Sequence, residues 1–167
     1  MDPHFIKCFM VSIQNVFSTM MQLQVSLKEP KLKTRDAQLA DVSGIIGLSG
    51  DVRGNVVLAF PKTTAERVVT LFCGVKLEAG DPDFADAIGE LVNMVSGNAK
   101  AMFKDRKCSI SCPNVVVGGA HSFSSPSDTT TVVIPCETDC GPLTLEISIH
   151  KPDAKTETTQ ASQAAKA

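Results

Sequence analysis

The sequence predicts an α+β domain in which two long helices pack on one face of a mainly antiparallel sheet. Apolar residues at helical spacing indicate the two long helices, over residues 3–23 and 82–104. Between and after them lie short segments rich in Val, Ile and Thr, separated by turn residues, which are typical of strands joined as hairpins. Helices on one side of such a sheet form a stable two-layer arrangement.

Length and composition are those of one globular domain. The chain has 167 residues, of which 43% are hydrophobic and 20% charged, and its net charge is -2. This charge does not favour nucleic acid or an anionic membrane, and no apolar run is long enough to span a bilayer. Residues 1–17 lack the features of a signal peptide, so we expect a cytoplasmic protein. The domain should cover residues 1–150, and residues 151–167, which contain no large apolar residue, should form a disordered tail.

The first helix is amphipathic, and Pro3 is compatible with its first turn. Its apolar residues recur at intervals of three and four, and they are Phe5, Phe9, Ile13, Val16, Phe17, Met20 and Met21. Residues 24–33 then alternate in the manner of a strand, which Pro30 interrupts. The helix should therefore lead directly into a short, broken strand.

A hairpin and a short helix come next. Residues 42–49 and 55–60 are rich in Val, Ile and Leu, and the turn between them contains Gly-Asp. Thr63 or Thr64 can cap a helix that runs to residue 73, because a hydroxyl can accept a bond from a free N–H group of the first turn. Gly74 suits the end of that helix.

The second long helix has clear start signals. Asp81 is a good N-cap residue, Pro82 suits the first helical position, and Asp83 lies favourably near the positive end of the helix dipole. Basic residues at the other end, among them Lys104, complement the negative end of the dipole. We expect this helix to run to about residue 104.

The remainder of the chain reads as strands. Residues 108–117 form one strand in which Pro113 is confined to an edge or an end. Residues 118–127 should form a loop, and residues 130–138 and 143–150 should form a hairpin.

Six cysteines raise the question of disulfides or a metal. They are Cys8, Cys73, Cys108, Cys112, Cys136 and Cys140, and with three scattered histidines they match no zinc spacing. We expect small buried thiols in a reducing compartment and no metal site. Cys136 and Cys140 flank the last predicted turn, and the sequence leaves their redox state open.

The second long helix carries a polar stripe, defined as Asp86, Glu90, Asn93 and Gly97, which fall within a narrow arc of one helical face. Small residues flank this stripe, namely Gly89 and Ala101. Each glycine inside a helix costs roughly 1 kcal/mol relative to alanine. Close approach of another surface would explain that cost, and we place Asn98 nearer the apolar side.

Two ordinary explanations of the polar stripe remain open. Polar residues on an exposed helix face are often only solvated, and Asp86 gains from the helix dipole without any function. The glycines could also face a neighbouring helix. In addition, residues 12–18 echo residues 90–96, with Ser12 where the second copy has Glu90, which suggests an internal duplication in which only the second copy has the carboxylate.

The pattern Asp-x3-Glu-x2-Asn-x3-Gly-Asn, residues 86–98, resembles the signature of the CheX/CheC/FliY chemotaxis phosphatase family. Pro113 follows Asn93 by twenty residues, close to the interval of that signature. The first helix and the hairpin 44–60 also resemble this family, so the likeness covers about residues 3–150. A single complete pattern resembles CheX, whereas CheC-like members carry two.

The resemblance implies a CheC-like fold and a phosphatase that hydrolyses the phospho-aspartate of a CheY-type receiver domain. Asn93 would orient the attacking water and Glu90 would pair with the receiver's active-site lysine. Asp86, Gly89, Gly97 and Ala101 would form the surrounding contact surface. The receiver would supply Mg²⁺, and this chain would bind no cofactor.

Relatives in this family are homodimers joined through their sheets, so the resemblance implies a homodimer, with residues 132–134 or 143–149 as candidate edge segments. Two other functions remain open from the sequence. The chain could be a non-catalytic receiver-binding or flagellar-switch adaptor, or a structural domain with no partner at this helix.

Overall fold

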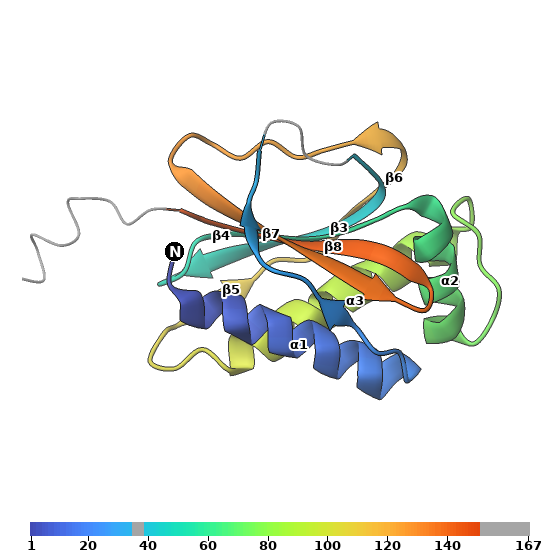
Figure 1. Ribbon diagram of the computed structural model, residues 1–167, viewed down its shortest axis with the longest axis horizontal. Coiled ribbons are helices and arrows are strands. Elements are labelled where there is room, and N and C mark those ends of the chain that lie inside the picture. The colour runs from blue at the N-terminus through green and yellow to red at the C-terminus, as the bar shows by residue number, and fades with distance from the viewer. Residues whose placement is uncertain (35–38, 151–167) are drawn as a thin grey trace, which may run out of the picture.

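An antiparallel sheet with its helices on one side forms the framework of the computed structural model, which describes residues 1–34 and 39–150. Figure 1 shows the two long helices, α1 and α3, below the sheet, as the α+β prediction requires, and the short helix α2 at its right-hand end. The helices are α1 (Pro3–Met21), α2 (Lys62–Cys73) and α3 (Pro82–Ala101). The tail predicted at residues 151–167 lies outside the described residues.

The sheet has eight strands. They are β1 (Ser26–Leu27), β2 (Lys31–Leu32), β3 (Ala40–Gly50), β4 (Gly54–Phe60), β5 (Cys108–Ile110), β6 (Asn114–His121), β7 (Thr129–Thr138) and β8 (Gly141–His150). The order across the sheet is β1-β7-β8-β4-β3-β5, with β2 also paired to β7 and β6 also paired to β3. All of these pairs are antiparallel.

The prediction of edge strands at residues 132–134 and 143–149 was wrong. Residues 143–149 belong to β8, which lies inside the sheet between β7 and β4. Residues 132–134 belong to β7, whose outer side is taken by β1 and β2. The two short strands before β3 return to the sheet and cover β7, so the free edges lie along β1 and β2 at one side and β5 and β6 at the other.

Several element ends differ from the sequence prediction. Helix α2 begins one residue before Thr63, after Pro61, and no side chain caps it. Helix α3 ends at Ala101 because Met102 already leaves the helical hydrogen-bond pattern, and Asp105 then adopts a left-handed φ of 55°. The single strand predicted at 108–117 is divided into β5 and β6 around Pro113, which has no N–H group to donate.

The predicted loop at 118–127 is also shorter than expected, because β6 continues to His121. Gly118 and Gly119, which suggested a loop, lie in this strand with φ values of 95° and 62°. The register of the β3–β6 pair shifts at this point, because Ala40 pairs with His121 whereas Val42 pairs with Val117. Glycine therefore marks an irregularity of the strand rather than its end.

Helix α3 packs directly on the central strands. Its inner residues are fully buried, and they are Phe84, Ile88, Leu91, Val92 and Val95. Gly44 on β3 makes this close packing possible, because a Cβ atom there would lie 3.0 Å from Val92 Cγ1 and 3.2 Å from Ile88 Cγ2. The absence of one side chain thus sets how deeply α3 sits on the sheet.

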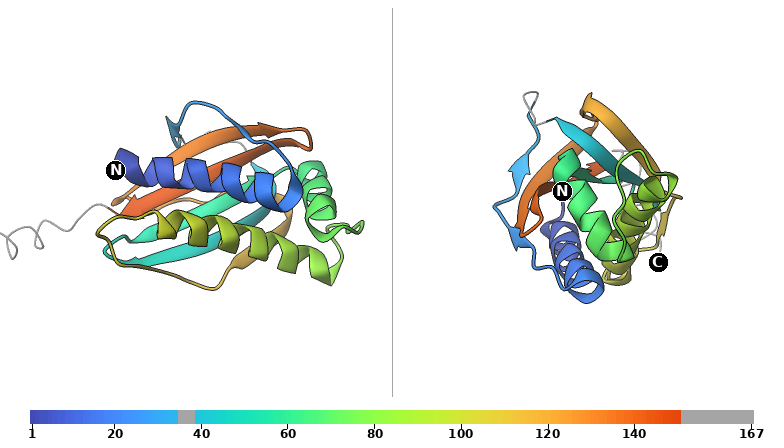
Figure 2. Two further views of the ribbon diagram at one scale, coloured as in Figure 1. Left: turned by 90° about the horizontal axis from the view of Figure 1, so that it is seen from below. Right: turned by 90° about the vertical axis from the view of Figure 1, so that its right-hand side faces the viewer.

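Helices α1 and α3 lie side by side and run in opposite directions (Figure 2). The Ser12 hydroxyl on α1 donates a hydrogen bond to the carbonyl oxygen of Val95 on α3, at 2.6 Å. At the far end of α3, the ring of Phe103 packs edge-on against Phe5 and Phe9, with centroid distances of 5.0 and 5.9 Å. These contacts hold α3 from its side and its end, so its outward face has a fixed orientation.

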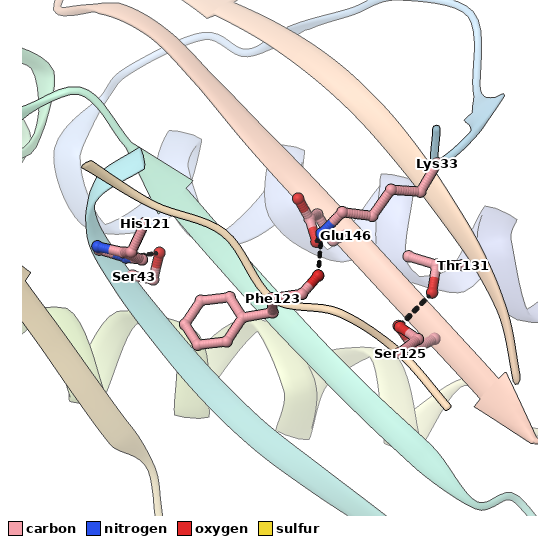
Figure 3. A network of polar contacts seen from close by, with 8 residues as sticks. Lys33, Ser43, His121, Phe123, Ser125, Thr131 and Glu146 are labelled. Atoms are coloured by element: carbon pink, nitrogen blue, oxygen red, sulfur yellow. Dashed lines mark hydrogen bonds and ion pairs between the residues drawn. The ribbon is translucent and has the colours of Figure 1, made fainter. Parts of the chain in front are cut away.

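The other face of the sheet carries a polar network (Figure 3). The Lys33 ammonium lies 2.7 Å from a carboxylate oxygen of Glu146 on β8 and donates to the Phe123 carbonyl oxygen, also at 2.7 Å. Nearby, Ser43 and His121 share a hydrogen bond of 2.9 Å. The segment between β6 and β7 is thereby tied across this face.

Candidate functional site

The start of helix α3 is set by local sequence. Asp81 is the N-cap residue and Pro82 occupies the first turn, as predicted. The Asp81 carboxylate does not cap the helix itself, because it accepts a hydrogen bond from the Glu78 backbone N–H at 2.7 Å. Asp83 lies in the first turn, where its charge is favourable to the helix dipole. These features fix which residues of α3 face outward.

The polar stripe lies on the outward face of α3. Asp86 and Glu90 are exposed, and Asn93 and Gly97 are half-buried. Ala101, the last residue of the helix, is also exposed. In the left view of Figure 2, no other helix or strand lies in front of α3. The structure therefore brings the predicted site residues together on one accessible surface, with the exception of Gly89.

The polar side chains of Glu90 and Asn93 do not help to hold the described domain together. Within residues 1–34 and 39–150, neither side chain has a hydrogen-bond or ion-pair partner. They lie three residues apart, which is about 4.5 Å along a helix axis. A carboxylate can bind a cation, and a neutral carboxamide can both accept and donate a hydrogen bond. The pair can thus hold a charged group and a water molecule side by side.

The two glycines around the polar stripe have different surroundings. A Cβ atom at Gly97 would have no neighbouring atom within 4 Å, so a binding partner can reach the helix backbone at this position. Gly89 is buried, and a Cβ atom there would lie 3.3 Å from Pro113 Cγ and 3.5 Å from Val115 Cγ2. The expectation that Gly89 leaves room for a partner was wrong. It leaves room for Pro113, which the chain itself places against the edge of the polar stripe.

The position of Asn98 was also mispredicted, and Lys100 was missed. Asn98 is exposed rather than turned toward the core. Lys100 is exposed and lies about 20° around the helix axis from Asn93, since seven residues nearly complete two turns. The same helical-wheel calculation that defined the polar stripe would have included Lys100.

Helix α1 does not offer a second site. Asn15 is exposed on α1, as the echo of Asn93 suggests, but Ser12 is fully buried and bonded to Val95. Where α3 has the exposed carboxylate of Glu90, α1 has a short hydroxyl turned toward its neighbour. Only α3 carries the complete set of groups.

The cysteines and the cavity lie apart from the polar stripe, except for Cys112. No disulfide joins the six cysteines, of which Cys73 and Cys112 are exposed and the other four are buried. Burial raises the pKa of the Cys136 thiol to about 12.

A cavity of about 220 Å³ lies among the strands and the loops next to them. It is lined by residues such as Lys31, Leu39 and Thr144, and no residue of α3 lines it.

In the described part of the chain, no group of three or more His, Cys, Asp or Glu side chains could hold a metal ion. No helix there is both long and apolar enough to cross a membrane. The polar stripe is the outward side of a helix and lines no part of the cavity described above, whereas sites for small molecules are usually concave. A surface of this shape fits a protein partner that brings its own cleft.

Comparison with known proteins points to one family. The family model described as chemotaxis phosphatase CheX matches residues 42–137, which include the whole polar stripe and Pro113. No curated protein matches the chain in a sequence search. Among solved structures, a CheC-like superfamily protein from Shewanella sp. PV-4 is similar with a TM-score of 0.83 and 31% identity, over 90% of this chain and 100% of that one.

Two further structures extend this result. The chemotaxis protein CheX from Desulfovibrio desulfuricans is similar with a TM-score of 0.80 and 30% identity, over 87% of this chain and 99% of that one. The CheX chain in a CheX-CheY-BeF3-Mg²⁺ complex from Borrelia burgdorferi has a TM-score of 0.74 and 20% identity, over 88% and 98% of the two chains. The last similarity concerns the fold alone.

Proposed function

The chain belongs to the CheX family of chemotaxis phosphatases, and from this premise we propose that it hydrolyses the phospho-aspartate of a CheY-type receiver domain. The observation that carries the proposal is the pair of exposed Glu90 and half-buried Asn93, whose side chains have no polar partner within the described residues, on a helix held from its side and its end. The complex of the Borrelia burgdorferi relative with CheY, beryllofluoride and Mg²⁺ supports a receiver as the partner. Hydrolysis would end the chemotaxis signal that the phosphoryl group carries.

In the proposed reaction, Asn93 positions the water. Its carbonyl oxygen accepts a hydrogen bond from the water, whose oxygen then attacks phosphorus in line with the bond to be broken. The new P–O bond forms as the P–O bond to the receiver's aspartate breaks. The products are a free aspartate carboxylate and inorganic phosphate, which takes the water's oxygen and both of its protons and can then release one proton to solvent. A neutral carboxamide suits this role because a carboxylate would repel the phosphoryl group.

Glu90 would dock the receiver. We propose that its carboxylate pairs with the lysine beside the receiver's phosphorylation site, which places Asn93 at the right depth. Phosphoryl transfer depends mainly on positioning and on charge stabilisation, and Mg²⁺ held by the receiver would supply much of the latter. This chain then needs no metal site of its own.

The remaining contact residues have smaller roles in the proposal. Asp86, one turn before Glu90, would lie at the margin of the contact, and Gly97 and Ala101 would let the receiver approach the helix backbone. Pro113 would support the edge of the polar stripe through its contact with Gly89. We also propose a cytoplasmic homodimer, which would use the free edges along β1 and β2 or along β5 and β6.

The test is to mix the chain with a phosphorylated CheY-type receiver and Mg²⁺ and to follow phosphate release. Release faster than the receiver's own rate supports the phosphatase. Binding without faster release, across a panel of receivers, would identify an adaptor instead. The panel would also show which receiver is the substrate.

A further inference from the structure

Lys100 extends the polar stripe toward the C-terminal end of α3. It is exposed, it lies close to the angular position of Asn93, and it follows Asn93 by about 10 Å along the helix axis. The outward face of α3 thus presents a carboxylate, a carboxamide, open backbone and an ammonium in succession. The last of these has no part in the water-directing chemistry proposed above.

Charges are segregated along this face. Asp83, Asp86 and Glu90 lie in the first half of α3, and cations follow at its other end. We define the basic end as Lys100, Lys104, Arg106 and Lys107, all of which are exposed. Among the described residues, none of these four side chains forms an ion pair.

Two carboxylates lie near the basic end and do not neutralise it. Asp105 is in the same segment, and the Asp51 carboxylate is occupied by the backbone N–H of Lys107 at 2.8 Å. Asp2 and Lys7, at the start of α1, act on the pKa of the Cys8 thiol together with Lys104 and add one charge of each sign, so the cations still outnumber the carboxylates here. The helix dipole favours a cation in the last turn of α3, but it does not require that cation to lie on the arc of Asn93.

We propose that the basic end docks an acidic surface of the phosphorylated receiver, beside the pocket that Asn93 enters. This inference rests on the proposed function and names a second part of the contact. Glu90 attracts a cation of the partner, and the basic end attracts anions. Lys100, where the basic end begins, lies about 15 Å from Glu90 along the helix axis. The receiver can then lie along α3 in one direction only, since the reverse direction would oppose like charges.

A protein surface fits better than a nucleic acid or a lipid membrane. The chain has a net charge of -2, and Asp86 and Glu90 lie on the same face of α3 as Lys100. An extended polyanion would be repelled by Asp86 and Glu90 while it contacted Lys100. A folded partner with both signs of charge avoids this conflict.

The experiment measures the Kd of the full chain for a receiver activated with beryllofluoride and Mg²⁺, a complex that needs no turnover. Lys100→Glu should raise the Kd by about tenfold at an ionic strength of about 0.02 M, and the effect should shrink at about 0.3 M because salt screens exposed charges. Lys62→Glu is the matched control. Lys62 is exposed at the start of α2, outside α3 and outside both proposed dimer edges, and its substitution should leave the Kd unchanged.

An unchanged Kd for Lys100→Glu at low ionic strength overturns the inference. It does not affect the proposed function, which is tested separately by phosphate release with the wild-type protein. An equal rise in Kd for Lys62→Glu also overturns the inference, since only net charge would then matter. If Lys100→Glu fails to fold, Lys104→Glu, which lies outside the helix, carries the same expectation. A wild type that binds no activated receiver overturns both proposals.

Discussion

At the scale of single residues, Glu90 should govern how tightly the receiver binds. Glu90→Ala removes the proposed partner of a desolvated lysine at the interface. Loss of one partner of such a pair costs about 2 kcal/mol or more, which is roughly a thirtyfold rise in KM. Steady-state phosphate release over a range of receiver concentrations measures this. A KM equal to that of the wild type would contradict the docking role.

The fold of the Glu90→Ala protein should be unchanged. Glu90 is exposed and makes no contact that stabilises the described domain, so its thermal midpoint should stay close to that of the wild type. A loss of activity that accompanied unfolding would have a structural cause and would not support docking.

At the scale of elements, the same substitution at two glycines should have opposite effects on stability. Gly97→Ala adds a Cβ atom where nothing lies within 4 Å, and alanine favours the helix by up to about 1 kcal/mol. Gly44→Ala inserts a Cβ atom 3.0 Å from Val92 and should lower the free energy of unfolding by about 1–3 kcal/mol. Urea unfolding of both variants measures these changes.

Gly97 also links stability to function. If the receiver approaches the backbone there, Gly97→Ala should weaken receiver binding even though it stabilises the helix. A variant that is more stable and binds as well as the wild type would show that the glycine has no role in the contact.

Elements with local signals could be predicted from the sequence. The outward face of α3 follows from its own periodicity, and the Asp81–Pro82 start and the β7–β8 turn follow from a few adjacent residues. Glu90 and Asn93 were therefore identified as neighbours on one face before any coordinates. Their chemical role came from the family resemblance and not from the spacing itself.

Features that depend on distant parts of the chain could not be predicted. The contact of Pro113 with Gly89 joins a loop to a helix, and the pairing of β1 and β2 with β7 joins segments about 100 residues apart. The spacing of apolar residues along the sequence does not show which distant segments come into contact, so it predicts neither of these two contacts. For this reason the pattern of the sequence favours an open surface at Gly89 and sheet edges at β7 and β8, and both predictions are wrong.

At the scale of the whole molecule, the Lys33–Glu146 pair joins the early strands to the centre of the sheet, across 113 residues of sequence. The two side chains are only 12% and 11% exposed. Glu146→Ala leaves the ammonium buried without its partner, so we expect unfolding to become easier by about 3 kcal/mol or more. Lys28→Ala is the control, since its pair with Glu137 is 59% and 50% exposed and contributes less than about 1 kcal/mol.

Denaturant unfolding of these two variants compares the pairs. Because the Lys33–Glu146 pair lies on the other face of the sheet from α3, folded Glu146→Ala protein should retain phosphatase activity. Equal stability losses in the two variants would show that burial of the pair has no special importance.

Alkaline pH should destabilise the fold through its buried thiols. Burial raises the pKa of Cys136 from 9.0 to about 12, so between these values the unfolded chain loses a proton that the folded chain keeps. The free energy of unfolding should therefore fall above pH 9, by up to about 1.4 kcal/mol per pH unit for this group. Guanidinium midpoints from pH 8 to 11 measure the slope, and Cys136→Ala should reduce it. An identical slope in the variant would contradict this assignment.

The most direct test of the whole account is single-turnover dephosphorylation of a receiver by Asn93→Ala, with Asn15→Ala as the control. Both substitutions remove a carboxamide from the outward face of a long helix, but only Asn93 lies beside Glu90. We expect Asn93→Ala to fold normally and to leave the phospho-receiver at its own slow decay rate, whereas Asn15→Ala should keep full activity. Wild-type turnover by folded Asn93→Ala would contradict it.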